Sequence, residues 1–312
     1  MNARARLVAA SQTSIAKGSK SFAMASTLFD KATRERAWLL YAWCRACDDL
    51  ADGQVMGHGR TAVSDPMARL AMIRTRTEDA LAGRETGEVA FDALGLVVRE
   101  CRIPHGLPRD LVKGFALDAA DFQPRNEIDL YRYCYHVAGV VGVMMAIVMG
   151  VSPTDEDVLD RACDLGIAFQ LGNIARDISE DAAAGRCYLP EDWLAEMDVP
   201  PGEEMKPPYR ARLAVLAGRL AERAGRYEVS ARHGTPALSF RSAWAVLAAA
   251  GIYGDIAREV AARGSQAWDH RVVTTRTAKL GWVAKAAGQA ARRRTLWDGK
   301  ASRDGLWTRP RA

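Results

Sequence analysis

Apolar side chains recur along this chain at spacings of three and four residues, which is the period of an amphipathic α-helix. Alternation with a period of two, the pattern of a half-buried strand, is almost absent. Turn-forming residues interrupt the helical pattern, and the segment 185–208 alone holds five prolines. We therefore expect an all-α fold, a single large helical bundle, with helices at residues 31–52, 66–83, 89–100, 109–120, 129–150, 154–181, 208–230, 236–263 and 275–294.

Neither a repeat of solenoid length nor a linker divides this pattern. We expect one helical domain over residues 1–294, followed by a basic tail, 295–312, that is poorly ordered. The longest run without charged or strongly polar side chains, residues 137–151, is shorter than the ~20 residues that span a bilayer. It is interpreted as a buried helix.

The net charge of +5 can be supplied by the C-terminal residues alone, because the last 21 residues hold seven basic and two acidic side chains. The nearly neutral remainder argues against a nucleic-acid groove across the fold. Two interpretations of the basic tail, with Trp297 and Trp307, stay open: a peripheral contact with the inner face of a membrane, or a solvated tail.

The cysteines and the N-terminus indicate a reduced, cytoplasmic protein. Cys44 and Cys47 form a C-x-x-C pair without a second pair or a nearby histidine, so a zinc site is not expected. The first residues lack the apolar core of a signal peptide.

The first candidate site lies in the expected helix 31–52. One narrow face of this helix holds residues spaced i, i+4, i+7 and i+11: Tyr41, Arg45, Asp48 and Asp52. All other residues from 38 to 52 are apolar except Asp49, which is typical of a helix buried nearly all round. Carboxylates in such a place need a partner. That partner is either a bound cation or, within the chain, the guanidinium of Arg45.

A second stripe follows the same rule in the expected helix 154–181. Its members are Gln170, Asn173, Asp177 and Asp181, and the first two are the only polar side chains between residues 165 and 175. The alternative interpretation is an exposed last turn of the helix.

Together the two stripes point to one chemistry. If the helices face each other, four aspartates and an asparagine surround one cavity, and such oxygen donors favour Mg²⁺, with Mn²⁺ as a substitute. The expected ligand is a diphosphate, whose oxygens would be held by nearby basic residues: Lys20, Arg45, Arg176 and Arg271. Ionisation of the diphosphate leaves an allylic cation that a dry cavity protects from water. The signature motifs of nucleotide-binding loops, serine hydrolases and zinc proteases are absent.

In these motifs the chain resembles the squalene/phytoene synthase family, and it is most similar to the bacterial branch that uses geranylgeranyl diphosphate. The resemblance covers about residues 11–294 and rests on six motifs in the family's order: GSKSF at 18–22, YAWCRACDDLAD at 41–52, YCYHVAGVVG at 133–142, QLGNIARD at 170–177 with Asp181, GRCYLP at 185–190 and AWDHRV at 267–272. One departure is Gly172, where the family usually has threonine.

The resemblance implies an isoprenoid-synthase fold with a central cavity, and a magnesium-dependent prenyltransferase that needs no NADPH. Two molecules of geranylgeranyl diphosphate would join head to head through prephytoene diphosphate to give phytoene, the first committed step of carotenoid biosynthesis. A desaturase would receive the product. The alternatives are a farnesyl-using sibling that makes presqualene diphosphate, squalene or dehydrosqualene, and a helical assembly factor without catalysis.

The resemblance also implies roles for single residues. The metal ions would be held by Asp48, Asp52, Asn173, Asp177 and Asp181. The diphosphates would contact Ser19, Lys20, Ser21, Tyr41, Arg45, Gln170, Arg176, Tyr253 and Arg271. Catalysis would fall to Tyr133, Arg45, Asp48, Asp52 and Asp177. The alternative interpretation of Tyr133 and Tyr253 is as core aromatic residues, and that of Lys20 and Arg271 is as solvated surface charges.

Overall fold

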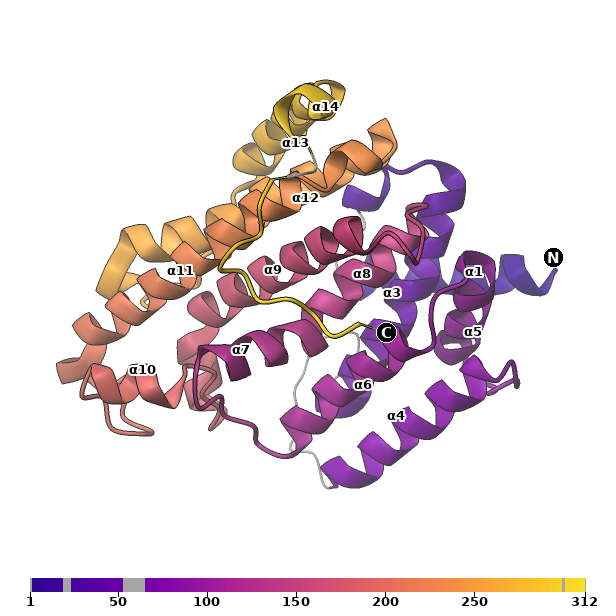
Figure 1. Cartoon of the computed structure of the whole chain (residues 1–312). Coiled ribbons are helices and arrows are strands. Elements are labelled where there is room, and N and C mark those ends of the chain that lie inside the picture. Colours follow the sequence, from indigo (N-terminus) through magenta and orange to yellow (C-terminus); the bar gives the residue numbers. More distant parts are fainter. Residues whose placement is uncertain (1, 19–23, 53–64, 299–300, 312) are drawn as a thin grey trace. The chain divides into compact units, whose positions relative to one another are not determined.

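The computed structural model describes residues 2–18, 24–52, 65–298 and 301–311, and of Asp52 only the backbone. These residues form helices, turns and loops without a strand (Figure 1), so the all-α prediction is confirmed. Each predicted helix overlaps an observed one. The predicted helix 129–150 is interrupted, because a π-helix occupies Tyr135–Gly139.

The chain packs as two compact units. The single helical domain expected over residues 1–294 stays a prediction. Unit 1 comprises residues 1–120 and 143–156, and unit 2 comprises residues 121–142 and 157–311. The chain crosses between the units without a change in composition. Periodicity indicates which side chains are buried, but not which helices pack together.

Unit 1 is built around α3, Lys31–Asp52, which packs against α1, Ala3–Gly18, and α5, Val89–Cys101. Its other helices are α4, Pro66–Leu81, and α6, Gly106–Ala119. Glu100 on α5 joins the three central helices, because it accepts hydrogen bonds from Arg4 at 2.6 Å and from Arg36 at 3.0 Å. α1 was missed by the sequence pattern, since its amphipathic character is weak and only Ser11 and Ile15 are buried.

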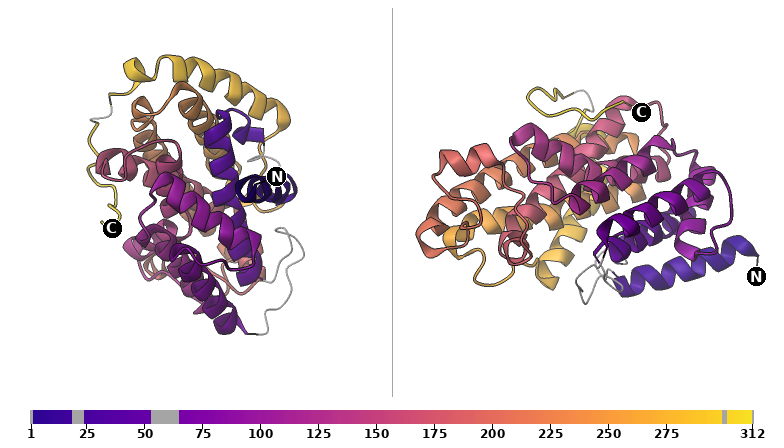
Figure 2. Two further views of the ribbon diagram at one scale, coloured as in Figure 1. Left: turned by 90° about the vertical axis from the view of Figure 1, so that its right-hand side faces the viewer. Right: turned by 90° about the horizontal axis from the view of Figure 1, so that it is seen from below.

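Unit 2 holds the remaining helices: α7 (Glu127–Cys134), the π-helix, α9 (Glu156–Ala183), α10 (Glu191–Glu196), α11 (Arg210–Arg232), α12 (Phe240–Arg263), α13 (Arg276–Ala291) and α14 (Arg293–Leu296). α8, Val140–Val148, begins in unit 2 and continues in unit 1. α12 packs against α11 and α13, and α13 lies alongside it in Figures 1 and 2. Side-chain caps fix three helix starts: Asn126 for α7, Ser239 for α12 and Thr275 for α13.

The π-helix packs backbone to backbone against α9. A Cβ added to Gly166 would lie 2.4 Å from the carbonyl oxygen of Ala138, and one added to Gly142 would lie 2.2 Å from that of Ala162. Such distances leave no room for any side chain at these positions. The small residues of this segment therefore serve close helix packing.

The C-terminal residues 301–311 belong to the tail 295–312, whose poor order stays a prediction. They lie against unit 2, where Arg309 is only 3% exposed. The physical reason is that Asp160 and Asp164 on α9 are buried and take arginine partners from the tail. Nothing in the sequence around these aspartates marks them as partners of residues more than a hundred positions away.

Two further features bear on the sequence interpretation. Within the described residues, the helical stretch 127–148 is long and apolar enough to span a membrane, but 61% of its most apolar window is buried inside the protein, as in a core helix.

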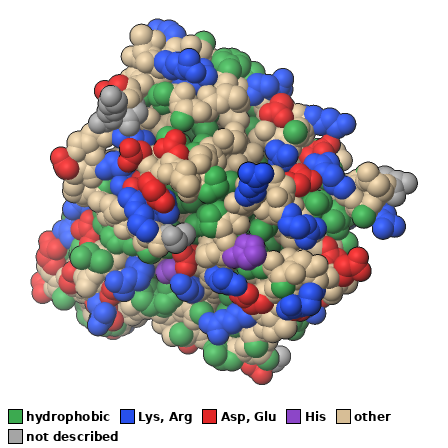
Figure 3. All heavy atoms as spheres, turned by 45° about the vertical axis from the view of Figure 1, so that its right-hand side comes forward, with side chains coloured by type: hydrophobic (Ala, Val, Ile, Leu, Met, Phe, Trp, Pro, Cys, Tyr) green, Lys and Arg blue, Asp and Glu red, His purple; other side chains and the backbone are tan. Residues whose placement is uncertain are grey.

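On the face drawn in Figure 3, basic and acidic side chains are interspersed among apolar ones, in keeping with a nearly neutral body.

We predict that Gly166→Ala lowers the free energy of unfolding by about 2 kcal/mol or more, because its Cβ would overlap a backbone carbonyl that cannot move freely. The matched control is Gly218→Ala on α11, where a Cβ meets nothing within 4 Å. This change should raise stability by about 0.5–1 kcal/mol through helix propensity. Urea denaturation of both variants checks the pair, and equal effects would contradict the close crossing.

Candidate active site

Tyr41, Arg45 and Asp48 of the first carboxylate stripe lie on α3 in unit 1, and the side chain of Asp52 lies outside the described residues. Arg45 Nε donates to the hydroxyl of Tyr41 at 3.3 Å, and Arg45 Nη1 lies 3.8 Å from a carboxylate oxygen of Asp48. The Asp48 side chain is 44% exposed, so a further cationic partner can still reach it. Burial raises the pKa of Tyr41, which keeps its phenol protonated as a donor.

The glycine-serine-lysine motif begins beside this stripe. Gly18 ends α1 at a point where an added Cβ would lie 2.7 Å from the Tyr41 hydroxyl oxygen and 3.4 Å from Arg45 Nε. The chain therefore leaves α1 next to the predicted diphosphate-binding groups of α3. Ser19, Lys20 and Ser21 themselves lie outside the described residues, and their roles stay predictions.

The second stripe lies along α9 in unit 2, at the edge of its core. Gln170, Asn173, Asp177 and Asp181 are all half-buried. The neighbouring positions on the helix, Leu171, Ile174, Ala175 and Ile178, are buried. Gly172, the departure from the family pattern, is buried against Ala257 and away from the stripe.

Two arginines hold Asp177 in this structure. Arg176 donates to both carboxylate oxygens, at 2.6 and 2.5 Å, and Arg271 Nη2 lies 2.8 Å from Oδ1. Arg271 also pairs with Glu180 at 2.5 Å. The structure thus brings Asp177, Arg176 and Arg271 together, while Glu180 is a contact that sequence reasoning missed.

The segment 267–272 is anchored to α9, which explains how Arg271 reaches the stripe. The indole nitrogen of Trp268 donates to the carbonyl oxygen of Ala175 at 3.1 Å. Ala267 and Val272 are buried on either side of it. Two motifs almost a hundred residues apart therefore form one cluster.

The two candidate tyrosines of unit 2 lie in aromatic stacks. Tyr133 is 3% exposed, between Tyr188 at a ring distance of 4.8 Å and Phe122 at 5.7 Å. Tyr188 belongs to the motif at 185–190, so this stack joins two further motifs. Tyr253 stacks on Phe169 at 4.5 Å, one residue before Gln170.

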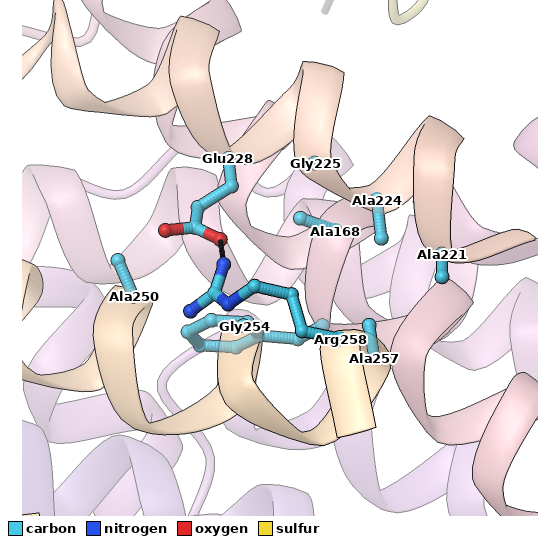
Figure 4. Close-up of a pocket in the computed structure, with 10 residues that line it drawn as sticks. Ala168, Ala221, Ala224, Gly225, Glu228, Ala250, Gly254, Ala257 and Arg258 are labelled. Carbon is cyan, nitrogen blue, oxygen red and sulfur yellow. Dashed lines mark hydrogen bonds and ion pairs between the residues drawn. The ribbon is translucent and has the colours of Figure 1, made fainter. Parts of the chain in front are cut away.

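A pocket that the sequence did not indicate lies beside Phe169 (Figure 4). It lies between α9, α11 and α12, is partly open to solvent, and has a volume of about 20 Å³, which is room for about one water molecule. Small side chains line it: Ala168, Ala221, Ala224, Gly225, Ala250, Gly254 and Ala257. The ion pair of Arg258 with Glu228, at 2.9 Å, supplies its polar wall. Small residues on three helices are also typical of close helix packing. The sequence pattern therefore did not indicate a pocket here.

Comparison with known proteins agrees with these motifs. The family model for squalene/phytoene synthase matches residues 15–278. The chain is 46% identical over 307 residues to a phytoene synthase of Pseudescherichia vulneris, covering 96% of this chain and 97% of the relative. It is also 46% identical to a 15-cis-phytoene synthase of Pantoea ananas, over 88% of this chain and 89% of the relative.

The chain belongs to the squalene/phytoene synthase family. Its structure is similar to a crystal structure of a dehydrosqualene synthase, with a TM-score of 0.81 and 25% identity over 92% of this chain and 98% of the other. The matched range includes all six motifs on which the predicted resemblance rested.

The donor atoms of the two stripes, on α3 and α9, are of a type that binds a metal cation. All their candidate ligands are carboxylate or amide oxygens, which Mg²⁺ prefers. Among the side chains that the structure describes, no three His, Cys, Asp or Glu residues form a group able to hold a metal by themselves. Mg²⁺ sites of this kind take part of their coordination from substrate phosphates and water.

We predict that Arg271→Gln weakens the binding of inorganic diphosphate in the presence of Mg²⁺ about tenfold, because charge-assisted hydrogen bonds contribute ~1.5–3 kcal/mol. Isothermal titration calorimetry measures this change. The control is Arg263→Gln, which removes an exposed pair with Glu259 on α12. An equal loss in both variants would show that Arg271 acts only through net charge.

Proposed function

We infer that this chain is a phytoene synthase, which joins two molecules of geranylgeranyl diphosphate head to head. The observation that carries the conclusion is 46% identity over 96% of the chain to a bacterial phytoene synthase. The cluster of Asp177, Arg176 and Arg271 supports it, since it supplies carboxylate and guanidinium groups of the kind that a metal-bound diphosphate needs.

The proposed metal ligands are Asp48 and Asp52 on α3 with Asn173, Asp177 and Asp181 on α9. The two sets belong to different units, so their convergence around one cavity is part of the proposal. Magnesium bound there would supply charge that stabilises the leaving diphosphate. Mn²⁺ has the same preference for oxygen donors and would substitute.

The basic residues would then change partners as substrate binds. Arg176 and Arg271 hold Asp177 now, and their N–H groups suit the non-bridging oxygens of a diphosphate equally well. In unit 1, Arg45 and Tyr41 are the corresponding donors, with Ser19, Lys20 and Ser21 following Gly18. Gln170 and Tyr253 complete the proposed diphosphate contacts.

In the first half-reaction, the bond between C1 and the diphosphate oxygen breaks, and the leaving group takes the electron pair. The double bond of the second substrate attacks the allylic cation, and loss of a proton gives the cyclopropyl intermediate, prephytoene diphosphate. Tyr133 is proposed to act at this stage. Its place between two aromatic rings excludes water from its surroundings. Ionisation, rearrangement and a second proton loss then yield phytoene, without a reductant.

Localisation belongs to the same proposal. The enzyme would act in the cytoplasm, with contact to the inner face of the membrane, because its substrate tails and product are lipidic. Arg303, Arg309 and Arg311 are engaged by Asp160 and Asp164. A membrane contact, and the transfer of product to a desaturase, would therefore use residues before the tail, such as the exposed Arg292 and Arg294.

The product distinguishes this function from its nearest alternative, a farnesyl-using sibling, which the structural similarity to a dehydrosqualene synthase keeps in view. We predict that the purified protein with Mg²⁺ and geranylgeranyl diphosphate, without NADPH, forms a forty-carbon hydrocarbon. Extraction and mass spectrometry identify it. A thirty-carbon product from farnesyl diphosphate, formed in preference, would overturn the assignment, and no product from either substrate would favour the assembly factor.

Two conservative substitutions test the carboxylates. Asp48→Asn and Asp177→Asn should each lower kcat at least about a hundredfold, because the loss of one charge weakens stabilisation of the departing diphosphate. Circular dichroism should show the helical fold intact. The control is Asp198→Asn at an 89% exposed position whose positive φ asparagine adopts readily. Normal turnover in either test variant would remove that residue from the site.

A further inference from the structure

The C-terminal residues 301–311 cross α11 and α9 toward α7 in Figure 1. They contact Arg161 on α9, Tyr227 on α11 and Tyr135 at the start of the π-helix, and these residues all belong to unit 2. We call residues 301–311 the strap. The proposed function assigns them no role, and the sequence predicted them to be poorly ordered.

The strongest contact of the strap is with Asp164 on α9. The Asp164 side chain is fully buried, and Arg303 holds both of its oxygens, at 2.7 and 2.9 Å. The hydroxyl of Ser230 on α11 donates to the same carboxylate at 2.5 Å. Burial raises the pKa of Asp164, and Arg303 opposes that rise. When α9 packs into the core, the Asp164 carboxylate loses its contact with water. A paired arginine is then required to stabilise its charge.

A second carboxylate, Asp160, takes arginines from the end of the strap. Arg311 donates to both its oxygens, at 2.6 and 3.0 Å, and Arg309 Nε lies 3.0 Å from Oδ1. Arg303 Nη1 also lies 3.3 Å from Asp160. Asp160 and Asp164 are one turn apart, so the strap grips a single face of α9.

Trp307 connects the strap to α11 and to the start of the π-helix. Its backbone N–H donates to the hydroxyl of Tyr227 at 3.0 Å, and its ring lies 5.7 Å from the ring of Tyr135 at the start of the π-helix. Tyr227 in turn packs edge-on against Tyr131 on α7, at 5.2 Å. The strap therefore contacts Tyr135 directly and reaches Tyr131, one turn earlier on the same side of this helical stretch, through Tyr227.

The strap contacts the opposite or flanking sides of the helices that carry the proposed reacting groups. On α7, Tyr133 lies two residues from both Tyr131 and Tyr135, which places it on the other side. On α9, the stripe from Gln170 to Asp181 is rotated roughly a third of a turn from Asp160 and Asp164. Rotation of either helix about its axis would move these groups, and the strap opposes such rotation.

We propose that the strap positions α9 and the π-helix for the reaction, with Arg303 and Trp307 as positioning residues that act through Asp164 and Tyr135. The proposal rests on the function inferred above. It predicts that a loosened strap impairs diphosphate binding and turnover in protein that is still folded, because small displacements of aligned groups have large effects on rate.

Two variants test the strap in the full-length protein. Trp307→Leu removes the ring contact with Tyr135 and leaves the ion pairs in place. The double variant Arg303→Met with Asp164→Asn removes both members of the buried pair, so that neither is left without the other. The control, Arg263→Met, removes an exposed pair on α12. Trp307→Leu carries the test if the double variant does not fold.

The readouts are the Kd for inorganic diphosphate with Mg²⁺ and kcat with geranylgeranyl diphosphate, both measured well below the Tm of each variant. We expect Kd to rise about fivefold and kcat to fall about tenfold in the strap variants, while the control stays within twofold. A lower Tm with wild-type Kd and kcat would overturn the proposal and leave only a stabilising role. If the wild type binds diphosphate but forms no hydrocarbon, the proposed function fails, and the Kd comparison still decides the strap.

Discussion

A carboxylate that leaves bulk water needs a positive charge beside it, and α9 meets this requirement at two places. Asp177 is held by Arg176 and Arg271, and the fully buried Asp164 is held by Arg303. These pairs fasten to α9 two segments that are remote in sequence, the 267–272 motif and the strap. The acids of α9 therefore fix where these two segments attach to unit 2.

The same constraint links structure to chemistry. The cluster of Asp177 with two arginines forms in the structure without substrate. Its carboxylate is a group that magnesium would attract, and its guanidinium groups are groups that diphosphate would attract. In the proposed function, these contacts between opposite charges would be exchanged for contacts with the charges of the substrate. Arg45, Tyr41 and Asp48 form a smaller version on α3, where the longer 3.8 Å separation leaves the carboxylate more accessible.

Much of this arrangement could be predicted from the sequence, and there are physical reasons for the elements that were missed. The stripes on α3 and α9 were found because a polar residue at helical spacing among apolar ones stands out. α1 escaped notice because only two of its residues are buried, and Tyr188 and Phe169 because an aromatic residue in a core pattern is ordinary. The π-helix was not predicted, because one extra residue in a turn leaves the spacing of apolar residues along the sequence nearly unchanged.

The sequence by itself determined the helical class, the faces that carry the carboxylates and the family, because each depends on spacing within a few turns of chain. Only the tertiary structure decided that Arg271 meets Asp177, that Trp268 meets Ala175 and that the strap reaches Asp164. With 43 basic and 38 acidic side chains, very many pairings satisfy charge equally well. Which of them form is decided by how the helices pack, and that depends on contacts between residues far apart in the chain.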